Sequence, residues 1–266
     1  MMLLAIDIGN SNIVVGVVEN GKILHKARFA TDRIKTSDQY WVELKNALSL
    51  FDISPKSVEA AIISSVVPPV LNSVRSAVVK MTGIEPMVVG PGMKTGLNIL
   101  ADHPAQVGSD LISAAVAAVR DYPKPIIVID MGTATTISVL DRNGAFLGGS
   151  ICPGIKISSE ALTGRTAQLP AISLEAPKHA IGRNTIDCMK SGLMLGAAAM
   201  LDGMIDRMEG ELGEKVTVVA TGGISRFVIP ACRREIVLDM DLLLKGLVIL
   251  YENNRKDIHG EQSGTV

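Results

Sequence analysis

The chain has 266 residues, which is too long for one small hydrophobic core and suits two domains of ordinary size. Its net charge of −1 gives no basic field for nucleic acid. Its apolar fraction of 47% with only 3% aromatic residues favours an α/β protein over an all-β sandwich. The three cysteines stand far apart, which argues against a disulfide framework or a CxxC zinc site. No leader peptide and no apolar run of membrane-spanning length is found, so we expect a cytoplasmic protein.

The first residues predict a strand that breaks into a polar turn. The apolar run Met1–Ile6 leads into the stretch Asp7, Ile8, Gly9, Asn10, Ser11 and Asn12. Apolar β-branched residues resume over 13–18, so we expect a hairpin. Its backbone N–H groups and short polar side chains can bind an anion, and Asp7 can hold a hydrated Mg²⁺ that travels with a phosphate. The alternative is an ordinary hairpin whose turn happens to be polar.

Strands and helices then alternate. We expect a strand over 23–29, a helix over 37–51 capped by Ser37 or Asp38, a strand over 58–64, a helix over 70–81 and a strand over 86–89. Three strands in succession, followed by alternating helices and strands, predict a mixed sheet. No GxGxxG opens a helix in this half, and no GxxxxGK[ST] motif occurs in the chain.

A second polar segment precedes an alanine-rich helix expected over 111–121. It contains Gly108, Ser109 and Asp110. Since Asp is favoured at helix N-caps, its position alone favours a capping role for Asp110. The alternative is a catalytic role, because an Asp at a helix start can also face a substrate hydroxyl.

The second half of the chain repeats the opening. An apolar strand over 125–129 ends in Asp130-Met131-Gly132-Thr133, and strands are expected again over 137–140 and 145–151. The stretches AIDIGNSN and VIDMGTAT align at Asp and Gly, which indicates two like domains facing each other across a cleft. We expect domains over 1–118 and 119–254 and a polar tail over 255–266. Further helices are expected over 154–162, 191–208 and 242–253, with a strand over 216–220.

Paired DxGxx[NT] hairpins resemble those of the actin, Hsp70 and sugar-kinase superfamily, and the whole chain resembles the type III pantothenate kinases. The matching stretches are DIGNSN, TSDQY, SSVVPP, HPAQVGSD, DMGTATT, ICPG, AQLP, GRNT, ATGG and DLLLKGL. No single stretch is specific, but their order and spacing together are. The resemblance implies an α/β actin-like ATPase fold of two similar ribonuclease-H-like domains, each a mixed five-stranded sheet flanked by helices. It also implies ATP-dependent phosphorylation of pantothenate to 4'-phosphopantothenate, the first step of coenzyme A biosynthesis.

The same resemblance implies roles for individual residues. ATP phosphates would be bound by Asp7, Ile8, Gly9, Asn10, Ser11, Asn12, Ile13 and Val14, with Mg²⁺ near Asp7, and the rest of the nucleotide by Thr133, Gly222 and Gly223. Pantothenate would be bound by Gly108, Ser109, Asp110, Leu111 and Thr185, with Thr185 supplied by the same chain or by a partner subunit. Asp110 would accept the proton of the attacking hydroxyl, and Asp130 would bind a monovalent cation, K⁺ or NH₄⁺. A homodimer with the active site near the subunit interface is implied as well, with no nucleic-acid or membrane partner.

Two positions depart from the family pattern. The family usually has Arg directly after the Asp of the Gly-x-Asp motif, where this chain has Leu111, and often has Tyr where this chain has Ala101. Losing Arg removes a charged, multidentate donor on the acceptor side, so other groups such as Arg183 or Arg165 would have to hold the acceptor. Two alternatives therefore stand beside pantothenate kinase: a related small-molecule kinase with another acceptor, and a non-catalytic ATP-binding accessory protein. Retention of Asp110 and Asp130 weighs against the latter.

Overall fold

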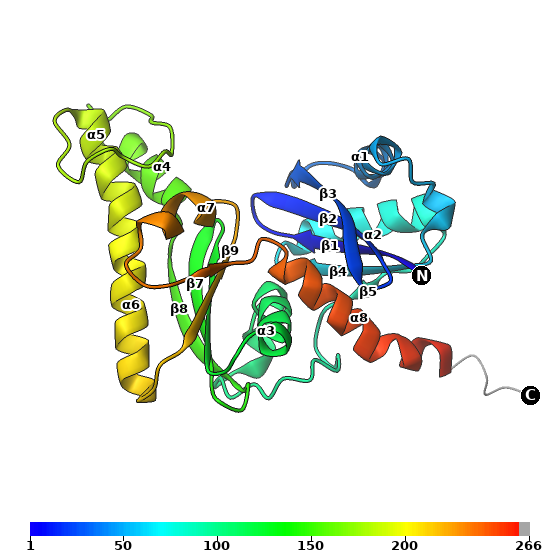
Figure 1. The fold of residues 1–266 in the computed structure, drawn as a ribbon. Coiled ribbons are helices and arrows are strands. Elements are labelled where there is room, and N and C mark those ends of the chain that lie inside the picture. Colours follow the sequence, from blue (N-terminus) through cyan, green and yellow to red (C-terminus); the bar gives the residue numbers. More distant parts are fainter. Residues whose placement is uncertain (261–266) are drawn as a thin grey trace, which may run out of the picture. The chain divides into compact units, whose positions relative to one another are not determined.

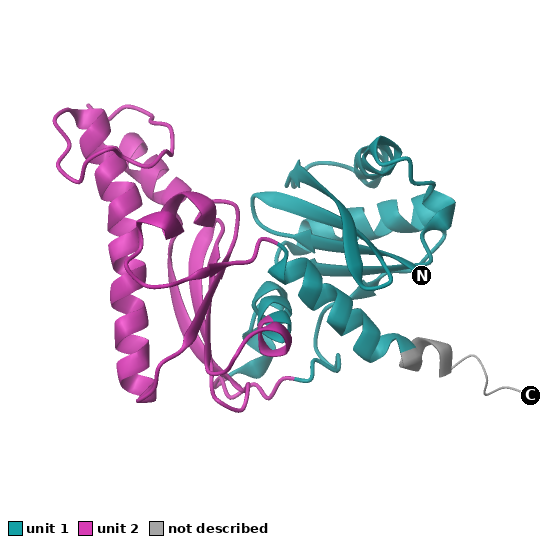
Figure 2. Ribbon diagram, viewed as in Figure 1, with its two compact units in different colours: residues 1–96, 103–117, 241–266 teal, residues 97–102, 118–240 magenta. Residues whose placement is uncertain are grey.

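The computed structural model describes residues 1–260, with side chains as far as Arg255. The chain forms two compact units, coloured separately in Figure 2. Unit 1 comprises residues 1–96, 103–117 and the chain from 241 onward, and unit 2 comprises residues 97–102 and 118–240. Each unit is built around one five-stranded sheet.

The sheet of unit 1 has the strand order β3-β2-β1-β4-β5. Its strands are β1 (Met2–Ile8), β2 (Asn12–Glu19), β3 (Lys22–Ala30), β4 (Ala60–Ser65) and β5 (Met87–Val88). Neighbouring strands from β3 to β1 pair antiparallel, whereas β1, β4 and β5 pair parallel. The sheet is therefore mixed, as the β-β-β-α-β-α-β pattern predicts.

The sheet of unit 2 repeats this topology, with the order β10-β9-β6-β7-β8. Figure 1 labels its strands β7, β8 and β9. Its strands are β6 (Ile126–Met131), β7 (Ala134–Leu140), β8 (Phe146–Pro153), β9 (Thr217–Thr221) and β10 (Val237–Leu238). The hairpin strand β6 pairs antiparallel with β7 and parallel with β9, as β1 does with β2 and β4. The internal similarity read from the two Asp-x-Gly stretches is thus a similarity of whole sheets.

Helices alternate with strands along the chain and pack on the sheets. They are α1 (Ser37–Leu50), α2 (Pro68–Thr82), α3 (Ser109–Asp121), α4 (Ile155–Arg165), α5 (Thr185–Lys190), α6 (Gly196–Leu212), α7 (Ser225–Val228) and α8 (Leu242–Gly260). In unit 1, α1 and α2 pack on the face of β2 that carries Val15 and Val17. Gly16 points to the other face, where a Cβ would lie 2.8 Å from Cδ1 of Leu244 in α8. In unit 2, α4, α6 and α7 share one core with β6, β7 and β9.

Two helix starts differ from the predicted ones. The N-cap of α1 is Thr36, not Ser37 or Asp38, because the Thr36 side chain accepts from the Gln39 N–H while the Gln39 side chain accepts from the Thr36 N–H. This reciprocal pair is a capping box, and it satisfies two N–H groups at once. Helix α3 begins at Ser109, so Asp110 lies inside its first turn and is not the residue before it.

Helix α8 departs from the domain boundaries expected from the sequence. It was expected in the C-terminal domain, yet it belongs to unit 1. Its leucines Leu242, Leu244, Leu247 and Leu250 are buried. Burial of four leucines outweighs nearness in sequence, because hydrophobic stabilisation depends on the apolar area removed from water. The helix also continues to Gly260, so residues 255–260 of the predicted polar tail are helical, and the remainder of that tail lies outside the described residues.

One long apolar helix qualifies the expectation that no segment reaches membrane-spanning length. Helix α5, a π-helical segment (Ser191–Leu195) and α6 run on as one helix, Thr185–Leu212, of 28 residues with a mean hydropathy of 1.2 over its best window. Only 28% of that window is buried within the chain. The helix nevertheless packs Leu201 and Ile205 into the core of unit 2 and buries Glu209 against Arg234, which are features of a helix on a folded protein.

Two helical glycines should respond oppositely to Ala. A Cβ on Gly246 of α8 would lie 1.8 Å from the carbonyl oxygen of Ser113 in α3, so Gly246→Ala must push the helices apart and should cost about 1–3 kcal/mol or more. Gly210 of α6 has no atom within 4 Å of its Cβ position, so Gly210→Ala should stabilise by up to about 1 kcal/mol. Urea unfolding of both variants measures this, and a Gly246→Ala protein as stable as the parent would contradict the close α3–α8 contact.

Candidate functional site

The first hairpin is a turn held closed by its own backbone and by Thr31. The Gly9 N–H donates to the Asn12 carbonyl oxygen at 3.0 Å, which closes the turn between β1 and β2. Thr31, directly after β3, donates its N–H to the Ser11 carbonyl at 3.0 Å and its hydroxyl to the Gly9 carbonyl at 2.7 Å. With these two carbonyls occupied, the exposed side chains of Asn10, Ser11 and Asn12 face solvent. No sequence pattern marks Thr31, since it stands in an ordinary polar connection.

The second hairpin has the same design with one residue fewer. Asp7 pairs with Val14, seven residues on, whereas Asp130 pairs with Thr136, six residues on. The Gly132 N–H donates to the Ala134 carbonyl oxygen at 3.0 Å, as Gly9 does in the first turn. The two turns therefore share the Asp-x-Gly start but present different side chains after it.

Glycines border the second hairpin on two sides. A Cβ on Gly154, the N-cap of α4, would lie 2.1 Å from the carbonyl oxygen of Thr133. Gly222, directly after β9, has a φ of +91°, and a Cβ there would lie 2.5 Å from Oδ1 of Asp130. Only glycine fits this left-handed conformation and close approach. The structure thus brings together Asp130, Thr133, Gly222 and the neighbouring Gly223 in unit 2. Gly154 is an addition to the predicted set, and the ICPG stretch was its signal.

In unit 1, the predicted acceptor-binding residues lie at the same sheet edge as the first hairpin. Asp7 on β1 stands beside Ser64 on β4, and the Ser64 hydroxyl donates to the Ser109 hydroxyl at 3.0 Å. Ser109 is the first residue of α3 and Asp110 the second. The Asp7 hairpin and the segment Gly108–Leu111 are therefore neighbours, as the predicted roles require.

The Asp110 carboxylate sits in a partly buried position shaped by glycine. Its Oδ1 accepts from the Leu111 N–H at 2.8 Å, and a Cβ on Gly108 would lie 2.4 Å from the same oxygen. Burial raises the pKa of the Asp110 carboxyl, and hydrogen bonds from the Leu111 and Asp110 backbone amides oppose that rise. A carboxylate whose pKa is raised is a stronger proton acceptor than an ordinary one, which suits a general base.

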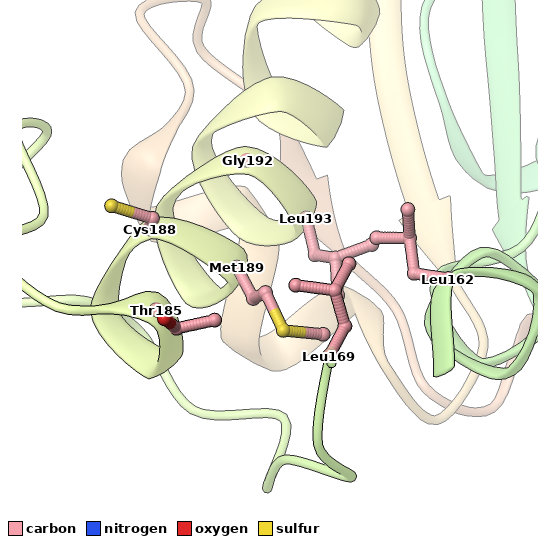
Figure 3. Close-up of a pocket in the computed structure, with 7 residues that line it drawn as sticks. All are labelled: Leu162, Leu169, Thr185, Cys188, Met189, Gly192 and Leu193. Carbon is pink, nitrogen blue, oxygen red and sulfur yellow. The ribbon is translucent and has the colours of Figure 1, made fainter. Parts of the chain in front are cut away.

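Thr185 lies in another part of unit 2. It is the first residue of α5, after Asn184, whose side chain caps that helix by accepting from the Asp187 N–H at 2.9 Å. Its side chain lines a pocket of about 440 Å³ whose other lining residues are Leu162, Leu169, Cys188, Met189, Gly192 and Leu193. Figure 3 shows Met189 and the leucines lying close together, with Cys188 directed away from them. The pocket is apolar apart from Thr185 and the thiol, so Thr185 is its one strong hydrogen-bonding side chain.

No group of three or more His, Cys, Asp or Glu side chains converges within the part of the chain that the structure describes. Single carboxylates at strand ends suit Mg²⁺, which keeps several waters and binds through one or two carboxylates together with substrate phosphates. Asp7 and Asp130 both occupy such positions, at the ends of β1 and β6. Gly222 also keeps open the space beside Asp130 Oδ1 that a Cβ would fill.

Comparison with known sequences identifies relatives along nearly the whole chain. A model of the type III pantothenate kinase family matches residues 3–207. Type III pantothenate kinases from Listeria welshimeri and Listeria monocytogenes are each 42% identical over 254 residues, covering 96% of this chain and 98% of theirs.

Comparison with solved structures shows the fold. The putative Baf family transcriptional activator from Campylobacter jejuni superimposes with a TM-score of 0.60 at 18% identity, over 95% of this chain and 99% of that one. The activator of 2-hydroxyisocaproyl-CoA dehydratase from Clostridium difficile, with bound ADPNP, gives 0.58 at 14% identity over 100% and 99%. MreB 5 of Spiroplasma citri, bound to AMPPNP, gives 0.55 at 11% identity over 98% of both chains. At these identities the likeness concerns the fold alone, and it confirms the predicted two-domain actin-like class.

Asp110→Asn should raise the thermal stability at neutral pH. Because the pKa of Asp110 is raised in the folded chain, the folded state binds its proton more readily than the unfolded state. The stability that protonated Asp110 contributes is therefore fully present below the unfolded pKa of about 3.9, and it is lost as pH rises through the folded pKa. Asn cannot ionise, yet its Oδ1 still accepts from the Leu111 N–H. The gain in Tm over the parent should thus be largest at neutral pH and vanish at about pH 4.

Calorimetric melting at the two pH values measures this difference. The matched control is Glu19→Gln, which neutralises an exposed carboxylate at the end of β2 in the same unit. A gain for Asp110→Asn that is equal at both pH values, or equal to that of the control, would contradict the burial of the Asp110 charge.

Proposed function

The chain belongs to the type III pantothenate kinase family, and we propose how its residues divide the reaction between them. The protein is an ATP-dependent transferase that phosphorylates pantothenate, the first step of coenzyme A biosynthesis. The likeness to type III pantothenate kinases along nearly the full length of the chain carries this function.

The ATP side is assigned to the two hairpins and their bordering glycines. Residues 7–14 bind the phosphates, through the backbone N–H groups of the turn and the exposed side chains of Asn10, Ser11 and Asn12. Thr133, Gly222 and Gly223 bind the nucleotide. The bonds from Thr31 to the Gly9 and Ser11 carbonyls support this role, because they turn carbonyl oxygens of the loop toward the protein and away from an incoming anion.

The proton of the attacking hydroxyl goes to Asp110. Phosphoryl transfer needs alignment, charge neutralisation and a base near the nucleophile, but little covalent chemistry from the protein. Asp110 lies at the start of α3, beside the sheet edge that carries the first hairpin. Because a carboxylate is a much weaker base than an alkoxide, Asp110 accepts a hydrogen bond from the hydroxyl in the ground state and takes the proton late, as the bond to phosphorus forms.

Two carboxylates are assigned to cations. Asp7 would hold Mg²⁺ together with ATP phosphates, and Asp130 would hold a monovalent cation, K⁺ or NH₄⁺. When bound, these cations neutralise charge on the phosphates. The contribution of the chain is to place each carboxylate at the end of a central strand, with Gly222 leaving room beside Asp130.

Acceptor recognition differs from the usual family pattern at Leu111 and Ala101. Leu111 contributes a backbone N–H to Asp110 but no charge, so we assign the acceptor carboxylate to another cation, Arg183 or Arg165. Gly108, Asp110, Leu111 and the backbone of Ser109 complete the acceptor side, and Thr185 joins them from the same chain or from a partner subunit.

The protein acts in the cytoplasm as a homodimer with its active site near the subunit interface. The largely uncovered helix over 185–212 supports this assembly, because a second copy would remove its apolar surface from water. Ile181 and Ile186, which flank the start of this helix, are 82% and 46% exposed, which supports the same covering surface.

ADP release tests the function directly. With Mg²⁺ and K⁺ present, ADP should form only when pantothenate is added, and omission of K⁺ should lower the rate. Release that ignores pantothenate but follows another hydroxylated acceptor would replace pantothenate as the substrate. Nucleotide binding without turnover on any acceptor would instead indicate an accessory protein.

A further inference from the structure

The segment Ser64–Pro69, the SSVVPP stretch, joins three elements of unit 1. The Val66 N–H donates to the carbonyl of Ile8, the residue before the hairpin glycine, at 3.1 Å. The Ser65 hydroxyl accepts from the Val67 N–H at 3.1 Å, where α2 begins. The Ser64 hydroxyl reaches Ser109 at the start of α3. The segment therefore fixes the first hairpin, α2 and α3 to one strand end.

The Ser109 hydroxyl is fully occupied by this junction. It donates to the Ser65 carbonyl at 3.1 Å, and it accepts from the Ser65 N–H at 3.2 Å and from the Ser64 hydroxyl at 3.0 Å. A serine hydroxyl has one hydrogen and two lone pairs, so no capacity remains for a substrate. The side chain of Ser109, expected to touch the acceptor, acts on the protein instead.

Ser64 cannot touch a substrate either. It is 0% exposed, and the strand register places it beside Asp7. Its hydroxyl is a buried polar group whose loss leaves Ser109 with an unfilled lone pair, which costs more than the bond itself contributes. The Ser64 hydroxyl contacts Ser109, and the residue after Ser109 is Asp110, so this hydroxyl is connected to the proposed base through one hydrogen bond.

We propose that Ser64 is a positioning residue for phosphoryl transfer, whose hydroxyl holds Ser109 and thereby sets where Asp110 stands relative to the Asp7 hairpin. This inference rests on the proposed function for the role of Asp110. It accounts for two adjacent serines at the end of β4: Ser64 holds α3 and Ser65 holds α2. The end of β4 therefore supports the proposed base through Ser64, in addition to holding the start of α2 through Ser65.

Ser113 provides a matched control. It is also 0% exposed, lies on the same helix α3, and donates its hydroxyl to the Ser109 carbonyl at 2.7 Å, one turn earlier. Ser113→Ala removes a buried hydroxyl and one hydrogen bond, as Ser64→Ala does. The lost bond, however, lies within α3 and does not tie the helix to β4.

The test compares the steady-state kinetics of Ser64→Ala and Ser113→Ala in the full chain. Ser64→Ala should lower kcat by between about tenfold and 10²-fold, the cost of a base misplaced by about 1 Å, and leave KM for ATP unchanged. Ser113→Ala should lose comparable stability but keep the parent kcat. Ser64→Cys, which keeps a weak donor of similar size, should fall between the parent and Ser64→Ala. An unchanged kcat in Ser64→Ala, or equal falls in both alanine variants, would overturn the proposal.

Hydrogen exchange gives a readout independent of turnover. Amides over 109–112 should exchange faster in Ser64→Ala than in Ser113→Ala, because only the first variant loosens the start of α3 from β4. If the parent shows no pantothenate-dependent turnover, the proposed function fails, and exchange still decides whether Ser64 holds this helix start. Equal exchange in the two variants would refute the link itself.

Discussion

The candidate site residues of both units depend on one constraint, the parallel pairing of two strands. In unit 1 these strands are β1 and β4, and in unit 2 they are β6 and β9. Parallel strands end at the same edge of a sheet, so whatever follows the second strand meets the turn that follows the first. In unit 1 this pairing puts Ser64 and Ser65, and through them α3 with Asp110, beside the Asp7 turn. In unit 2 it puts Gly222 against Asp130. One topology thus places, in each unit, an Asp-x-Gly turn beside the segment that follows the parallel strand.

Sequence patterns predicted the strands well, because the patterns that mark a strand and its turn are local in the sequence. Apolar runs ended by Asp-x-Gly mark buried strands and tight turns, and both hairpins lie where the two stretches placed them. The patterns missed what depends on distant contacts. The short elements β10 and α7 have no periodicity of their own. Helix α8 joins unit 1 because its leucines are buried there, with Leu244 against Gly16 of β2. The predicted start of α1 was wrong for a local reason, because the Thr36–Gln39 capping box was not recognised.

The candidate site shows a similar division. Asp7, Gly9, Asp110, Asp130 and Gly222 were predicted, and the structure groups the first three in unit 1 and the last two in unit 2. Their supports were not foreseen, because Thr31 and Ser64 act through hydrogen bonds to residues 22 and 45 positions away. Asp110 also differs from its simplest reading: it is not an N-cap but a partly buried carboxylate in the first turn, next to a glycine that makes room for it. The position of Asp110 in the sequence indicated where the residue lies, but not that burial disfavours its charged form.

The most direct test of the account separates nucleotide binding from proton acceptance in Asp110→Asn. Calorimetric titration with MgATP should give the parent Kd, because Asp110 is assigned to the acceptor and not to the phosphates. Single-turnover transfer to pantothenate should fall by about 10²–10⁴-fold, the usual contribution of a general base. A variant that binds MgATP normally and transfers phosphate at near the parent rate would contradict the assignment of Asp110 as the base.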